Sequence, residues 1–167
     1  MLDKVIFPAD HDPRVSSLYA LNEIDAKAPI ETVWKMLVEA ETWFEHFPPE
    51  NQIEILDGGR ELVEGTRFTR HTVGFSMRCI VTEFVPMRRL AWSTLVDGDE
   101  TASTAYHGWV LTPTDTGTHI LTEETLQGPF YLEEIGRKAP GALYDYHQTW
   151  VEGLAHRAET LAGTVAA

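Results

Sequence analysis

Four polar side chains with useful chemistry are predicted to point into the protein interior: Arg70, His107, Glu124 and His147. His107 lies two residues before Trp109 in a strand-like segment, so both side chains should share the inner face of that strand. A histidine can transfer a proton near neutral pH, and a buried arginine can bind an enolate or a carboxylate. We therefore take Arg70 and His107 as the candidate catalytic residues.

Aromatic side chains are expected to form the walls of the same interior space. Strand alternation places Phe68 on one face with Arg70, and Trp150 lies one turn after His147 on a predicted helix. Mostly apolar walls with a few polar groups suit a small, mostly apolar ligand. The full set of candidate ligand-binding residues is Phe68, Arg70, Trp92, His107, Trp109, Glu124, His147 and Trp150.

A purely structural role would explain the same polar residues. Arg70 would then pair with Glu124 or Glu83, since buried charges need partners, and His107 would be a hydrogen-bonded core histidine. The last strand has two mixed faces, with Glu123 on one and Glu124 on the other, and we place Glu124 inside. The functional interpretation rests on several titratable groups converging on one concavity.

Other kinds of site are not indicated. The seven histidines include no HExxH motif and no close ligand pair, so we expect no metal ion and no cofactor. No G-x-S-x-G nucleophile motif occurs. Cys79 is the only cysteine, which excludes an internal disulfide, and we expect it to be an inert core thiol.

The length, composition and net charge limit the class of protein to which the chain can belong. A chain of 167 residues with 43% hydrophobic residues suits one globular domain. The net charge of −13 argues against nucleic acids and anionic membranes as partners, because both are polyanions. We expect no signal peptide and no membrane insertion, because the sequence has no apolar run of about 20 residues. We expect a cytoplasmic protein.

The order of predicted elements is one strand, two helices, six strands and a long final helix. Residues 1–14 are expected to be a loosely held leader, because Pro8 and Pro13 discourage regular structure, and residues 15–163 a single domain. The predicted strands and helices are, in order, 15–26, a helix after Pro29, a short helix 40–47, 52–56, 66–73, 75–85, 89–96, 101–112, 118–127 and the helix 141–161.

Four segments resemble the START-like, or SRPBCC, superfamily. IDAKAPIETVWKMLVEAETWFEHFPPE resembles its first strand and paired helices, EFVPMRRLAW a middle hairpin, WVLTPTDTGTHILTEE the last hairpin, and HQTWVEGLAHRAE the closing helix. The resemblance is greatest to the polyketide cyclase/dehydrase-like and Hsp90-activator-like branches. It implies an α+β helix-grip fold, in which a bent antiparallel sheet wraps around the C-terminal helix and encloses an apolar pocket.

Three functions are compatible with this resemblance. The most economical is binding of a small hydrophobic molecule, whether aromatic, polyketide-like or lipid, in the internal cavity. The first alternative is a polyketide cyclase or dehydratase, since similar enzymes shape a chain and assist aldol closure or dehydration. The second is a co-chaperone-like protein-interaction domain. Similar proteins often dimerise, so a homodimer is also compatible, although no self-association motif is present.

Overall fold

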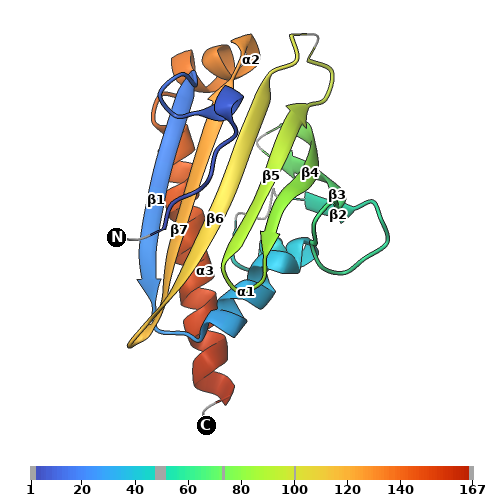
Figure 1. Cartoon of the computed structure of the whole chain (residues 1–167). Helices are drawn as coiled ribbons and strands as arrows, with labels where there is room; N and C mark the ends of the chain where they lie inside the picture. The colour runs from blue at the N-terminus through green and yellow to red at the C-terminus, as the bar shows by residue number, and fades with distance from the viewer. Residues whose placement is uncertain (1–2, 48–51, 73, 100, 166–167) are drawn as a thin grey trace.

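A 24-residue helix, α3 (Ala142–Val165), lies along one face of a curved antiparallel sheet (Figure 1). The computed structural model describes residues 3–47, 52–72, 74–99 and 101–165. Within these residues the sheet has seven strands in the order β1-β7-β6-β5-β4-β3-β2. The strands are β1 (Leu18–Ala26), β2 (Gln52–Ile55), β3 (Arg67–Thr72), β4 (Phe75–Val85), β5 (Arg89–Val96), β6 (Thr104–Thr114) and β7 (Gly117–Gln127).

Short helices occupy the connections at the two ends of the sheet. One set follows β1, another precedes α3, as Figure 1 shows, and the single short helix η1 precedes β1. They are η1 (Ala9–His11), α1 (Ile30–Val38), η2 (Ala40–Glu45), α2 (Pro129–Tyr131) and η3 (Leu132–Arg137). Helix α1 begins directly after Pro29, whose fixed φ suits a helix start. Gly128 and Gly141 bracket the second set with φ of 100° and 87°, values that favour glycine, and thereby set its position over the sheet.

The helix-grip fold expected from the sequence is confirmed. The predicted bounds of the strands 75–85 and 89–96 match β4 and β5, whereas β1 begins at Leu18 rather than at Val15. The predicted helix 40–47 is a 3₁₀ helix that ends at Glu45. Residue 73, which the sequence placed at the end of a strand, lies outside the described residues.

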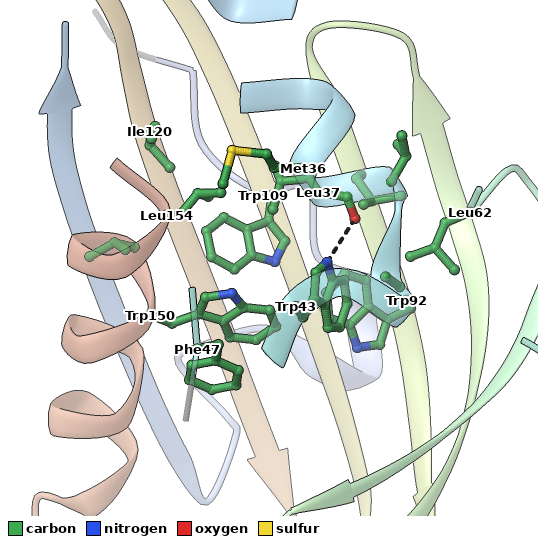
Figure 2. Packing of buried hydrophobic residues seen from close by; sticks show 14 of the residues in the cluster. Met36, Leu37, Trp43, Phe47, Leu62, Trp92, Trp109, Ile120, Trp150 and Leu154 are labelled. Atoms are coloured by element: carbon green, nitrogen blue, oxygen red, sulfur yellow. Dashed lines mark hydrogen bonds between the residues drawn. The ribbon is translucent and has the colours of Figure 1, made fainter. Parts of the chain in front are cut away.

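The interior between sheet and α3 is filled at one end by aromatic rings, which we call the aromatic core: Trp43, Phe47, Phe68, Trp92, Trp109 and Trp150. Figure 2 shows Trp150 reaching from α3 to Trp109, Phe47 and Trp43. Its ring stacks on Phe47 with centroids 4.1 Å apart and meets Trp43 and Trp109 edge-on, each at 4.9 Å. Such pairs add to the stabilisation that burial of the rings already gives.

Part of the outer face of the sheet, over β5, β6 and β7, is covered by residues 3–14, the expected leader. The backbone N–H of Val5 donates to Glu123 Oε2 at 2.8 Å, and the Tyr19 hydroxyl donates to Glu123 Oε1 at 2.6 Å. Val5 lies directly on Gly108, where an added Cβ would come within 2.5 Å of the valine side chain. Glu123 therefore points outward, and its buried carboxylate fixes this segment to β7.

Among the described residues, no helix is both long and apolar enough to cross a bilayer. The polar side of α3, which carries Glu152 and His156, is exposed, while Trp150, Val151, Leu154 and Ala158 are fully buried. The helix is therefore amphipathic, with its apolar stripe directed at the sheet.

Candidate functional site

A pocket of about 200 Å³ lies at the other end of the interior, between the sheet and the segment that runs from α2 to the start of α3. Its walls come from β3, β4, β7, α2, η3 and α3. They are mostly apolar, and the residues are Arg70, Thr72, Phe75, Met77, Glu124, Leu126, Tyr131, Glu134, Ile135, Ala139, Ala142, Leu143 and Tyr146. The short helices after Gly128 thus form the cover of the pocket.

Arg70 reaches the pocket from β3 and is only 4% exposed. Its guanidinium carbon lies 5.0 Å from the ring centre of Trp150 and 5.7 Å from those of Phe47 and Tyr146, so the cation is held among aromatic rings. Its Nη2 donates to the Tyr146 hydroxyl at 3.4 Å, and that hydroxyl also hydrogen-bonds Thr72. Burial would lower the pKa of Arg70, but Tyr146 and Glu124 raise it, so the side chain stays charged.

Glu124 reaches the same pocket from β7 and contacts two histidines. Strand pairing sets Trp92, His107 and Glu124 in one row across β5, β6 and β7. Glu124 Oε1 lies 3.6 Å from His107 Nδ1, and Glu124 Oε2 lies 3.0 Å from Nε2 of His147 on α3. The choice of Glu124 over Glu123 as the inward residue therefore agrees with the structure.

Burial and neighbouring charges shift the pKa values of Glu124 and His107 in opposite directions. Burial would raise the pKa of Glu124, but His107, His147 and Arg70 together lower it to about 2. Burial also lowers the pKa of His107 well below its usual value, and this effect outweighs the attraction of Glu124. At neutral pH Glu124 is ionised, His107 is neutral, and Arg70 supplies the positive charge.

The candidate residues fall into three groups. Arg70 and Glu124 line the pocket. His107 and His147 lie behind Glu124 and are fully buried or nearly so. The four aromatic candidates, Phe68, Trp92, Trp109 and Trp150, belong to the aromatic core, where their rings contact one another. The alternative partner for Arg70, Glu83, instead pairs with Arg89 at 2.9 Å.

Several pocket residues were missed by the sequence reasoning. Tyr146 lies one turn before Trp150, so helical spacing from that tryptophan could have identified it. Thr72 lies two residues after Arg70 in β3, so strand alternation could have identified it on the same face. Tyr131 and Ile135 come from the short helices of the cover, whose position over the sheet no sequence pattern indicates.

Comparison with known proteins supports the fold and the family. The family described as polyketide cyclase/dehydrase and lipid transport matches residues 21–162. A search among curated proteins finds no significant relative. A hypothetical protein from Helicobacter pylori superimposes with a TM-score of 0.85 at 23% identity, over 95% of this chain and 98% of that one.

Two further solved structures share the fold at lower identity. The di-domain aromatase/cyclase StfQ from the steffimycin biosynthetic pathway matches with a TM-score of 0.68 at 15% identity, over 87% of this chain and 51% of StfQ. Ara h 8.0201 matches with a TM-score of 0.63 at 13% identity, over 86% of this chain and 98% of the other. Identities this low establish a common fold and nothing finer. Because the family match spans most of its length, the chain belongs to the polyketide cyclase/dehydrase and lipid transport family, within the START-like superfamily.

Proposed function

We propose that the pocket binds a small, mostly apolar molecule through one acceptor oxygen directed at Arg70 and Tyr146. The observation that carries this proposal is the pocket itself, with apolar walls from Phe75, Met77 and Leu126 and donors gathered on one side. Concave apolar sites with a few convergent polar groups are the usual form of small-molecule sites. A carbonyl, phenolate or carboxylate oxygen would suit the donors.

The volume limits the ligand. A dry cavity of about 150 Å³ can hold benzene, and sites for drug-sized ligands start at about 300 Å³. At about 200 Å³ this pocket suits a single substituted aromatic ring or a short acyl chain. A lipid or an extended polyketide chain would need the cover of residues 129–141 to move, so the volume favours the aromatic class.

A cyclase- or dehydratase-type reaction is the second candidate, and the placement of Arg70 favours it. A buried guanidinium beside a ligand carbonyl would stabilise the negative charge that develops on the oxygen during enolisation or aldol closure. The low-polarity surroundings strengthen that interaction. The family match and the shared fold with StfQ, described as an aromatase/cyclase, are consistent with this role.

The first experiment identifies the ligand. Native mass spectrometry of the purified protein, followed by extraction, should reveal one small aromatic or short acyl molecule per chain. A panel of hydroxylated aromatic acids, short acyl compounds and lipids would then be titrated by calorimetry. Failure of every compound to bind, together with an empty purified chain, would count against a binding pocket.

Variants then separate binding from catalysis. Arg70→Gln removes the charged donor, and Arg78→Gln, on the exposed side of the neighbouring strand β4, is its matched control. Tyr146→Phe removes one hydroxyl, with the exposed Tyr144→Phe as its control on the same helix. A binding protein should lose affinity in Arg70→Gln, whereas an enzyme should retain ligand and lose most of its turnover.

A further inference from the structure

We propose that His107, Glu124 and His147 form a binding site for a divalent transition-metal ion such as zinc. The three residues come from β6, β7 and α3, and a ligand atom of each lies within 4.8 Å of the others. Two imidazoles and one carboxylate form a common ligand set for transition metals. This proposal does not depend on the small molecule proposed above.

The distances between the ligand atoms are close to those of a metal site, so the side chains would need only small adjustments to bind an ion. Zinc lies about 2.0–2.1 Å from nitrogen or oxygen ligands in a tetrahedron, which puts the ligand atoms roughly 3.3 Å apart. Glu124 carboxylate oxygens lie 3.0 Å from His147 Nε2 and 3.6 Å from His107 Nδ1, on either side of that value. The two imidazole rings have centroids 4.6 Å apart, so both approach the carboxylate from one region.

Hydrogen bonding of His107 leaves the correct nitrogen available for a metal. The Thr122 hydroxyl donates to the Gly108 carbonyl at 3.0 Å, so the same hydroxyl must accept from His107 Nε2, which lies 2.8 Å away. Neutral His107 therefore carries its hydrogen on Nε2 and a lone pair on Nδ1. That lone pair lies on the side of Glu124, so two electron-pair donors lie near each other without a proton between them.

This arrangement is the one found around metal-binding histidines. Such a histidine usually donates its second ring N–H to an oxygen, which fixes the tautomer and the ring orientation. Thr122 does this for His107. A cation placed between Nδ1 and the Glu124 carboxylate would convert an unfavourable contact between two acceptors into two favourable bonds.

His147 supplies a second, independent observation. Its side chain is 1% exposed, and within the described part of the chain neither of its ring nitrogens has a hydrogen-bond partner. The 3.0 Å contact with Glu124 lacks the direction of a hydrogen bond. Leaving a buried polar atom without a partner costs about 1–3 kcal/mol, so such atoms call for an explanation. A metal bond would provide one for Nε2, while Nδ1 would keep its present surroundings.

Ligand type and charge narrow the choice of ion. Nitrogen ligands disfavour magnesium and calcium, which prefer oxygen. Zinc with one carboxylate and two neutral imidazoles keeps one positive charge, and Arg70 adds another in the same region. The remaining coordination position should therefore take an anionic oxygen ligand, such as hydroxide. Catalytic zinc sites share this pattern of three protein ligands and one open position.

The test uses full-length protein without an affinity tag. After removal of metal with a chelator, the protein is titrated with Zn²⁺ and separately with Co²⁺, whose visible absorption reports tetrahedral coordination by nitrogen and oxygen. We expect one ion per chain, a cobalt spectrum of the tetrahedral type, and a rise in the melting temperature with Zn²⁺ but not with Mg²⁺. No uptake by the wild-type protein would overturn the proposal.

Variants locate the ion. His147→Gln should weaken Zn²⁺ binding by at least about 100-fold, and Thr122→Val, which keeps the ligands but removes the support of His107, by about 10- to 100-fold. His119→Gln is the matched control, because His119 lies 2.8 Å from Asp25 and 3.3 Å from Glu23 on the surface. Loss of binding in His119→Gln with retention in His147→Gln would assign the ion to the surface and reject the buried site.

Circular dichroism establishes that each variant is folded. If His147→Gln does not fold, the stoichiometry and spectrum of the wild-type protein and the weakened binding of Thr122→Val still decide the question. These measurements involve the metal alone. The proposal can therefore fail while the small-molecule pocket is retained, and the reverse also holds.

Discussion

The space between the sheet and α3 is solid at one end and hollow at the other, although the same two elements build both ends. Trp150 lies in the aromatic core and is fully buried, while Tyr146, one helical turn earlier, lines the pocket. Arg70 lies at the boundary, because its guanidinium contacts both rings. Whether the interior is filled or open therefore changes within one turn of α3.

The difference shows which residues stabilise the fold and which are available to a ligand. Large rings that contact one another leave no room, and their burial contributes to stability. The pocket residues include Phe75, Tyr131 and Tyr146 beside aliphatic side chains, but they leave a space between them, and the walls are completed by the short helices of the cover rather than by α3 alone. Substitutions at the two ends should therefore affect different measurements.

The largest effect is expected at the centre of the aromatic core. Trp150→Ala removes a ring that contacts Phe47, Trp43 and Trp109, and should lower the free energy of unfolding by about 3–5 kcal/mol. Urea denaturation measures this loss. A small loss of stability accompanied by a large loss of ligand affinity would place Trp150 in the binding site. That result would contradict the distinction between the aromatic core and the pocket.

The free energy of unfolding should also change with pH by a similar amount, because of a buried histidine beside the aromatic core. His46, next to Phe47, is buried, and burial, followed by the charge of Arg157, lowers its pKa to about 4. The unfolded chain binds this proton near pH 6.5, so stability is complete above that pH and falls as the pH drops toward 4. The expected loss is about 3 kcal/mol at 1.36 kcal/mol per pKa unit.

His46→Gln isolates this contribution to the pH dependence. Arg157 pairs with Glu45 at 3.0 Å, and both remain in the variant. Chemical denaturation at several pH values between 4 and 8 should show a shallower slope for His46→Gln than for the wild-type protein. Equal slopes would contradict the assignment.

Close packing of α3 on His46 should give the next largest effect on stability. An added Cβ at Gly153 would come within 1.9 Å of the His46 carbonyl oxygen, so Gly153→Ala should cost about 1–3 kcal/mol through overpacking. Gly163→Ala, in the same helix with open space around it, should instead stabilise the protein by up to about 1 kcal/mol. Thermal melts of the two variants should therefore shift in opposite directions.

The smallest effect on stability is expected in the pocket. Leu143 lines the pocket and is only partly buried, so Leu143→Ala should cost about 1 kcal/mol, below the range for a fully buried leucine. Ligand affinity should fall more clearly, because apolar contact is lost at the site. If calorimetry shows unchanged affinity with reduced stability, the pocket behaves like the aromatic core.

Strand alternation predicted most of the inner face from sequence alone. It placed His107 and Trp109 inside, because neighbouring side chains on a strand point to opposite faces and the apolar partners marked the inner one. Both faces of the last strand are mixed, so for Glu124 alternation only limited the choice to Glu123 or Glu124. The same reasoning tells in which direction a side chain points, but it does not give the volume of the space that the side chain faces. Whether four large rings line a space or fill it depends on how α3 is set against the sheet.

Two other features could not be read from the sequence. The cover of the pocket depends on the backbone turns at Gly128 and Gly141, which orient residues 129–141 in three dimensions. The His107, Glu124 and His147 cluster joins three elements, so its members are far apart in the chain and match no local metal motif. The expectation of no metal rested on searching for local motifs.

The N-terminal segment on the outer face has a consequence for association with other proteins. Val5 lies over an apolar strip that includes Tyr106, Val110 and Leu121. A partner that recognised this strip would compete with a segment of the same chain, whose effective concentration is on the order of millimolar for a short tether. Binding of such a partner is weakened by a factor that depends on this effective concentration and on the affinity of the segment itself for the strip, so the chain acts as its own competitive inhibitor at that surface.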